Sequence, residues 1–451
     1  MKLPSYQDSV RVCAVFLLNL VPLLTGSGYP DTPILDLFDE KSTGDNSAID
    51  TMPREGQTNY VPPGNGQKFY NKVIAGSRLR EGKLDWKRLA PRIINTPLHP
   101  IPLRLFPDVT LQFSPDTYTR VKGKTDTFVN TYRWSGPVAL EGKVVGDAIF
   151  IVDTVSQQIT ATITSEGLIY EIVTLESGLT RIYEWDSDRF PDDDRRERRG
   201  LVHEEQDSGQ CIIDVLILYT QDTKDFLQNH QLGNITGVVN RAIGVTNDAF
   251  KHSYINAEVQ VADTMLVPRD DFQESGVLED DLGKLQDPAH FGTKASALRD
   301  AVKADLVSLL VSSGDYCGAS PKFDGRLPNA KDGFSVVQVG CAANYYSLAH
   351  EIGHNLGTRH TRFDEQVPNG NNTSSNFGHL SLEEKTYTVM ATKRECKANN
   401  IRDCQRAALY SNPNVFYKNT RTPAGSADDT AKVDNSEYIR KQSCAIVSRN
   451  R

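Results

Sequence analysis

This chain is organised around one run of eleven residues, His350-Glu351-Ile352-Gly353-His354-Asn355-Leu356-Gly357-Thr358-Arg359-His360. Residues four apart lie on one face of a helix, so His350 and His354 can direct their imidazoles at a single point. Glu351 lies about 100° further around that helix, beside the point rather than on it. If the helix continued, His360 would lie about 9 Å further along its axis than His354 and could not reach the same point. The chain must therefore leave the helix near Gly357, where a residue without a Cβ adopts positive φ.

Three histidine ligands leave one position of a tetrahedral Zn²⁺ ion open, as in catalytic rather than structural zinc sites. Water in that position would have a pKa of about 7, and Glu351 would accept its proton as the general base. A secreted zinc-binding matrix or interaction protein with negligible turnover is the alternative interpretation. Glu351 counts against it because metal binding alone does not need this carboxylate. The predicted cofactor is Zn²⁺, held by His350, His354 and His360.

The full spacing resembles the extended signature His-Glu-x-x-His-x-x-Gly-x-x-His of the metzincin zinc metalloendopeptidases. In that family a methionine-containing turn lies beneath the metal, and the stretch Tyr387-Thr388-Val389-Met390-Ala391 is similar to it. The resemblance makes Met390 the methionine of this Met-turn. Segments 409–415 and 433–435 resemble the corresponding segments of the reprolysin-like (adamalysin-like) branch.

One position departs from that branch, whose members usually have Asp directly after the third histidine. This chain has Thr361 there and Asp364 three residues later, a change that leaves the ligands intact. The resemblance implies a secreted endopeptidase, made as a zymogen, that hydrolyses peptide bonds of protein or peptide substrates. It also implies that zinc-bound water is the nucleophile and Glu351 the general base.

The C-terminal part, residues 200–451, alternates strands and helices and is predicted to be a metzincin-like α/β catalytic domain with a mixed sheet. The resemblance implies that the strand ahead of the zinc helix, within 334–340, forms the cleft edge where substrate pairs as an added strand. The expected strands are 212–220, 257–261, 305–312 and 334–339, and the expected helices are 238–252 and 295–303.

The preceding part, residues 28–199, is interpreted as a propeptide in two sections. Residues 28–100 are polar, with scattered Pro and Gly and no sustained period, which predicts a mobile lead-in. Residues 103–186 contain short β-rich runs separated by turn residues. This pattern predicts a small antiparallel sandwich or barrel.

A charged break follows, and within it Arg196-Glu197-Arg198-Arg199 fits the Arg-x-Arg-Arg pattern of furin-like convertases. Cleavage after Arg199 would separate the propeptide from the catalytic domain, while a solvated linker is the alternative. Residues 28–199 contain no cysteine that could block zinc. Latency would need a carboxylate among Asp192 to Asp194, or steric cover.

The N-terminus is typical of a secretory signal peptide, which we assign to residues 1–27. Basic residues precede an apolar run from Val12 to Leu24, and small residues follow it. The run is too short to span a bilayer, and no later segment offers the roughly 20 apolar residues that a span needs. We therefore expect a secreted, extracellular product without a membrane span.

Cysteine usage agrees with export. Six cysteines follow the signal peptide, and an even number in an exported domain predicts three disulfides. Sequence alone does not decide the pairing. Proximity along the chain favours Cys317–Cys341 and Cys396–Cys404, which leaves Cys211–Cys444.

The length and net charge of the chain further limit the kinds of protein that it could be. The 451 residues suffice for two or three domains, each with its own core. A net charge of −8 argues against a nucleic-acid partner, for which a basic surface is expected. N-glycosylation tripeptides begin at Asn234, Asn371 and Asn372.

Overall fold

The computed structural model describes residues 35–38, 78–95, 98–121, 130–192, 211–321, 333–367, 374–417, 420, 422–428 and 431–441. The predicted signal peptide, residues 1–27, lies outside these ranges. Described residues all belong to one compact unit that extends from Ile34 to Arg451. Within them, no helix is long and apolar enough to cross a membrane.

A five-stranded mixed sheet is the centre of the C-terminal part, in the order β12-β11-β13-β15-β14. The first four strands run parallel, and their residues are largely buried because helices cover both faces. Only β14 is antiparallel, and it forms one edge of the sheet. The strands are β11 Cys211–Thr220, β12 Ala257–Val267, β13 Leu306–Val311, β14 Gly318–Ala319 and β15 Phe334–Gln338.

These strands confirm the predicted mixed α/β architecture and correct one assignment within it. We expected the strand within 334–340 to be the cleft edge. The structure instead places β15 between β13 and β14, so β14 is the edge strand of this sheet among the described residues. The two-residue strand β14 therefore occupies the edge position that we predicted for the strand within 334–340.

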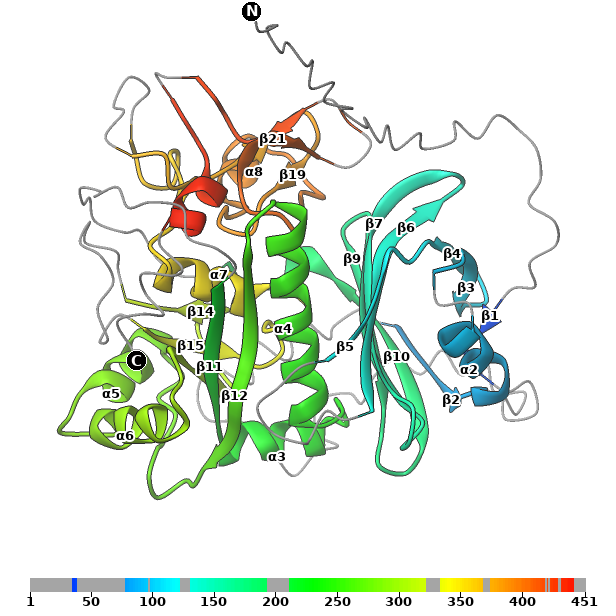
Figure 1. Cartoon of the computed structure of the whole chain (residues 1–451), viewed down its shortest axis with the longest axis horizontal. Coiled ribbons are helices and arrows are strands. Elements are labelled where there is room, and N and C mark those ends of the chain that lie inside the picture. The colour runs from blue at the N-terminus through cyan, green and yellow to red at the C-terminus, as the bar shows by residue number, and fades with distance from the viewer. Residues whose placement is uncertain are drawn as a thin grey trace, which may run out of the picture. The chain divides into compact units, whose positions relative to one another are not determined.

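The helices divide between the two faces of this sheet (Figure 1). Alternate side chains of β11 explain the division, since Ile213, Val215 and Ile217 pack on one side and Leu216 and Leu218 on the other. The first side carries α3 Gln221–Asn229, α4 Ile235–His252 and α7 Ser347–Asn355, and the second carries α5 Leu278–Gln286 and α6 Gly292–Val302.

Short elements follow α7 and complete the C-terminal part of the chain. Two of the predicted disulfides, Cys317–Cys341 and Cys396–Cys404, are confirmed. The elements are β16 Arg359–Thr361, β17 Phe377–Gly378, β18 Leu380–Ser381, β19 Thr386–Tyr387, α8 Arg394–Ala398, β20 Gln405–Arg406, β21 Asn412–Phe416 and β22 Pro423–Ala424.

The N-terminal part is a ten-stranded, mostly antiparallel sheet in the order β1-β3-β4-β6-β7-β8-β9-β10-β2, with β5 paired to β6. The β-rich prediction is confirmed, and an antiparallel bridge between Phe38, just past β1, and Leu84, just past β2, brings the two ends of this sheet together, as in a barrel. The strands are β1 Leu35–Asp36, β2 Arg78–Lys83, β3 Ile101–Phe106, β4 Val109–Phe113, β5 Thr117–Arg120, β6 Thr131–Leu140, β7 Lys143–Asp153, β8 Gln158–Ser165, β9 Leu168–Thr174 and β10 Leu179–Asp186.

Ordered elements also occur inside residues 28–100, where we predicted a mobile lead-in. Strand β2 pairs with β10 along its whole length, and helix α2, Trp86–Asn95, buries Leu89 and Ile93 against the sheet. The prediction is therefore wrong for these residues, because short polar segments become ordered by packing on a sheet formed elsewhere in the chain.

The two faces of the ten-stranded sheet have different neighbours. On β7, Phe150 belongs to the core shared with α2, whereas Ile149 and Ile151 point the other way, into a core shared with α4. That second core contains residues of both parts of the chain. The expectation that each domain has a core of its own is therefore wrong at this face.

Candidate metal centre

Helix α7 delivers the first two histidines, and the turn predicted after it brings in the third. The helix spans Ser347–Asn355, and Gly357 follows with a φ of 87°. Its amide donates to the His354 carbonyl at 2.8 Å, which closes the helix end. The chain then reverses into β16, which contains His360.

The three imidazoles meet at one point. Their Nε2 atoms are 3.0 Å apart for His350 and His354, and 3.1 Å apart for each of the other two pairs. A metal ion about 2.0–2.1 Å from each nitrogen, the usual Zn–N distance, fits above such a triangle. Among the described residues, these histidines form the group of His, Cys, Asp or Glu side chains that could hold a metal.

Backbone carbonyls fix the orientation of two of the rings. Nδ1 of His350 donates to the Val389 carbonyl at 2.7 Å, and Nδ1 of His354 donates to the Thr358 carbonyl at 2.9 Å. A protonated Nδ1 leaves the lone pair of Nε2 directed at the centre, as metal binding requires. Burial, reinforced by the neighbouring His354, holds the pKa of His350 well below its usual value. The ring is therefore neutral, which is the form that binds metal.

Glu351 lies fully buried beside the histidines, against the edge strand of the sheet. A Cβ on Gly318 of β14 would come within 2.2 Å of the Glu351 Oε1 atom. Glycine at 318 thus makes room for this carboxylate. The arrangement places a proton acceptor between the metal position and the strand edge on which a peptide could pair.

Met390 packs against helix α7, next to Gly353. Its sulfur would be 2.3 Å from a Cβ on Gly353, so glycine at the fourth position of the motif permits the close contact. The preceding residue supplies the Val389 carbonyl that holds His350. Met390 therefore supports the site by packing, and its turn orients a ligand through the backbone.

Asp364, four residues after His360, is buried and holds two segments of the site together. Its Oδ2 accepts hydrogen bonds from the Thr361 and Thr392 hydroxyls, each at 3.0 Å. The carboxylate thereby links the segment of His360 to the segment that follows Met390. Burial raises the pKa of Asp364, and the two hydroxyl hydrogen bonds oppose that increase. The sequence showed an acidic residue here but gave no sign of its partners.

Other predicted residues lie outside this centre. Arg199, Cys444, Asn371 and Asn372 fall outside the described residues. Cys211 is disulfide-bonded, and its predicted partner Cys444 is among those not described. The remaining candidate acceptor, Asn234, is exposed, and its side chain caps α4 by accepting from the Gly237 amide at 2.8 Å.

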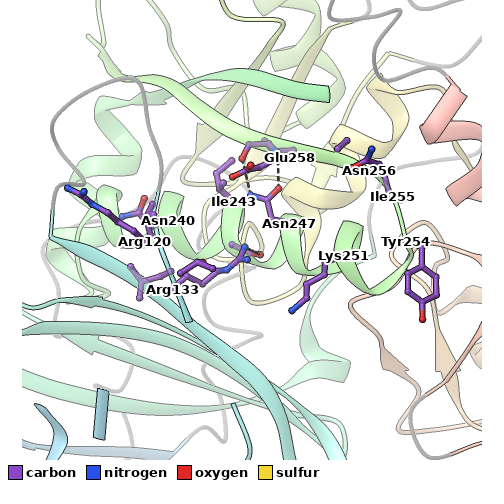
Figure 2. A pocket seen from close by; sticks show the side chains of 16 residues that line it. Arg120, Arg133, Asn240, Ile243, Asn247, Lys251, Tyr254, Ile255, Asn256 and Glu258 are labelled. Carbon is purple, nitrogen blue, oxygen red and sulfur yellow. Dashed lines mark hydrogen bonds between the residues drawn. The ribbon is translucent and has the colours of Figure 1, made fainter. Parts of the chain in front are cut away.

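A cavity of about 550 Å³ lies away from the histidines, between α4, the start of β12 and strands of the ten-stranded sheet (Figure 2). Its polar lining is largely occupied by contacts within the protein. Asn247 exchanges two hydrogen bonds with the backbone of Val259, and Arg133 lies 3.5 Å from Asp248. None of the motif residues lines this cavity, so it is separate from the metal centre.

Comparison with known proteins agrees with this geometry. Residues 210–404 match the model of a family described as metallo-peptidase family M12. The matched segment begins one residue before β11 and includes the three histidines, Glu351 and Met390. These observations support a metallopeptidase whose reaction depends on a metal.

Individual relatives carry a more particular name. A peptidyl-Asp metalloendopeptidase from Stenotrophomonas maltophilia is 28% identical over 204 residues, which is 45% of this chain and 46% of that protein. A second protein of that name, from Xanthomonas campestris pv. campestris, is 24% identical over 289 residues, or 61% of this chain and 64% of its own length. The chain thus spans about half to two thirds of the length of these relatives.

Among solved structures, metalloproteinase-II from Bacteroides fragilis is similar with a TM-score of 0.38 and 13% identity, covering 76% of this chain and 92% of that one. A chaperone-substrate complex gives a TM-score of 0.40 at 17% identity, covering 64% of this chain and 44% of that chain.

Proposed function

We propose that this chain is the precursor of a secreted zinc metalloendopeptidase of the reprolysin-like type. The observation that carries the proposal is the convergence of three Nε2 atoms within 3.0–3.1 Å of one another, with a buried glutamate beside them on the same helix. The similarity to metallopeptidases over the same residues supports it.

The donor set fits Zn²⁺ better than other common ions. Three imidazole nitrogens suit zinc, whereas Mg²⁺ and Ca²⁺ prefer oxygen ligands. His350, His354 and His360 would hold the ion, each through Nε2. Bound Zn²⁺ would supply Lewis-acid polarisation of the scissile carbonyl and would acidify a water molecule.

The remaining chemistry belongs to the chain's own residues. Glu351 accepts the proton of the attacking water and then delivers it to the leaving amine. Its burial excludes bulk water from the proton it carries. The edge strand β14 binds the substrate backbone as an added strand and aligns the scissile bond with the metal.

Substrates are proposed to be proteins or peptides with acidic residues near the cleaved bond. The support is the name of the relatives, peptidyl-Asp metalloendopeptidase, shared by matches from three genera. A cationic side chain would suit recognition of an aspartate, and Lys393 stands three residues after Met390.

Maturation is proposed to follow the route suggested by the sequence. Residues 1–27 act as the signal peptide, residues 28–199 as the propeptide, and a furin-like protease cleaves after Arg199. The product is extracellular and carries disulfides, with N-glycosylation at Asn234, Asn371 or Asn372 where the host supplies it. The absence of a described spanning helix is compatible with this route.

The direct test measures zinc content and hydrolysis in the same samples of full-length protein processed at Arg199. The unmodified protein should bind one zinc and cleave an Asp-containing protein, and a chelator should abolish cleavage. Glu351→Gln should keep the zinc and lose about 10²–10⁴-fold in rate, the usual contribution of a general base. His354→Ala should lose the zinc.

A matched control is His290→Gln, because His290 is an exposed histidine whose ring contacts only Asp287 among the described partners. That variant should keep both zinc and activity. Full zinc occupancy without cleavage of any substrate would favour the zinc-binding interaction protein instead. A processed protein that binds no zinc would contradict both interpretations.

A further inference from the structure

The last residues of the N-terminal part cross onto the catalytic part as a short segment, Ser187–Asp192, hereafter the strap. We propose that the strap occupies the substrate cleft and keeps the precursor inactive by presenting acidic side chains to the lysines that would bind an acidic substrate. This inference rests on the proposed function and specifies how the same site is regulated.

One end of the strap lies at the edge strand. The Cys317 amide donates a hydrogen bond to the Asp192 carbonyl at 3.1 Å. Cys317 directly precedes β14, whose Gly318 packs on the Glu351 carboxylate. A backbone hydrogen bond at this edge is the kind that an added substrate strand would make. The strap therefore uses a backbone donor directly next to the strand that packs on Glu351.

The other end of the strap lies beside the Met-turn. Lys393, which is 2% exposed, donates through Nζ to the Ser187 carbonyl and lies 3.4 Å from an Asp188 carboxylate oxygen. Lys397, on α8, forms an ion pair of 2.7 Å with Asp192. Two lysines that follow the Met-turn in the sequence thus pair with one acidic side chain each.

An aromatic contact fixes the middle of the strap. Phe190 is 3% exposed and stacks on Tyr345, with ring centroids 5.6 Å apart and planes at 7°. Tyr345 belongs to the turn that leads into α7, five residues before His350. Lys393 Nζ lies 5.1 Å from the centroid of the same tyrosine ring. The strap therefore packs on the two segments that frame the histidines.

These contacts account for latency without a propeptide cysteine. The edge-strand amide, the Tyr345 ring and both lysines are engaged by the strap, so an acidic peptide cannot reach the same groups until the strap leaves. The Asp192 end of the strap contacts both Cys317, next to β14, and Lys397 on α8, and the Ser187 end contacts Lys393.

The test uses the full-length chain carrying Arg199→Gln, which prevents processing at that position. Phe190→Ala removes the stacked ring, and Asp188→Ala removes a side chain that is 42% exposed and therefore not needed for folding. Each variant is assayed for hydrolysis of an Asp-containing fluorogenic peptide, with zinc content measured in parallel. Arg189→Ala is the matched control, because Arg189 lies in the strap but pairs only with Asp186 among the described residues.

The unprocessed Phe190→Ala precursor should hydrolyse the peptide about fivefold or more faster than its parent, since a stacked aromatic pair contributes about 1 kcal/mol beyond its burial. Asp188→Ala should increase the rate less, and Arg189→Ala should leave it unchanged. The strap proposal is overturned if the processed parent is active while both Phe190→Ala and Asp188→Ala precursors stay as inactive as the unprocessed parent. It is also overturned if the unprocessed parent already matches the processed protein. An inactive processed parent would instead contradict the proposed function.

Discussion

A buried ion pair between the two parts of the chain gives the sharpest stability prediction. Arg241 on α4 and Glu171 on β9 form a salt bridge in which the side chains are 1% and 6% exposed. Glu171 also accepts a hydrogen bond from the Trp185 indole at 3.2 Å. The second guanidinium nitrogen of Arg241 donates to Thr162 and Asn344. Replacement of Glu171 by leucine would leave a charged guanidinium buried without its counter-ion.

The expected cost follows from this burial. Removal of one partner of a buried pair typically lowers the free energy of unfolding by about 3–5 kcal/mol, because the remaining charge stays desolvated. The double variant Glu171→Leu/Arg241→Met removes both charges and should recover most of that loss. An exposed pair provides the control. Arg78–Asp108 has exposed fractions of 31% and 66%, so Asp108→Asn should cost less than about 1 kcal/mol.

The assay is urea unfolding of the full-length precursor, followed by tryptophan fluorescence. A Glu171→Leu cost below about 1 kcal/mol would refute the reasoning, as would a double variant no more stable than Glu171→Leu alone. Because the pair joins β9 to α4, its loss should also loosen the N-terminal part and raise the activity of the unprocessed precursor. A large loss of stability with unchanged latency would show that the pair does not hold the strap in place.

Three further predictions concern the metal centre and its surroundings. Gly318→Ala places a Cβ 2.2 Å from the Glu351 carboxylate, so the processed enzyme should keep its zinc and lose about 10²-fold in rate; an unchanged rate would contradict the assigned position of Glu351. Asp364→Ala removes an acceptor shared by two threonine hydroxyls, so the free energy of unfolding should fall by about 1–3 kcal/mol. A chelator should also remove zinc faster from this variant, and Asp364→Asn should give intermediate values of both quantities. Burial lowers the pKa of Lys393 from 10.5 to about 8, so above pH 8 the unfolded chain binds more protons than the folded one and stability should rise with pH. Relative to Lys393→Met, urea unfolding should show a gain of about 2 kcal/mol between pH 8 and 9.5, and a flat difference would exclude the shifted pKa.

The metal centre could be predicted from sequence because its geometry is mostly local. His350 and His354 are one helical turn apart, and Gly357 has the positive φ that the return of His360 requires. The contacts that orient the rings could not be predicted. They come from the carbonyls of Thr358 and Val389, and every residue has a carbonyl, so no side-chain pattern marks them.

The catalytic sheet was predicted well where strands are long and apolar, and poorly where they are short. β11 and β13 are nearly continuous hydrophobic runs, as buried parallel strands are. β14 consists of only Gly318 and Ala319, too few residues to show any period. The edge of the sheet was therefore assigned to β15, the nearest strand that the sequence could show.

Elements whose structure depends on distant contacts were missed. Helix α2 contains Pro91, which normally argues against a helix interior. It forms because Leu89 and Ile93 bury their side chains against the ten-stranded sheet. The strap was not predicted from the sequence, since nothing local shows that Phe190 stacks on a tyrosine 155 residues later. Sequence pattern detects local periods, and these features depend on tertiary packing.

The central claim, that three histidines hold a catalytic zinc, is tested most directly by zinc-edge X-ray absorption of the processed protein. The account predicts about three imidazole nitrogens and one further light atom at roughly 2.0–2.1 Å, with one imidazole fewer in His360→Gln. A sulfur neighbour at about 2.3 Å, or an unchanged spectrum in His360→Gln, would contradict it.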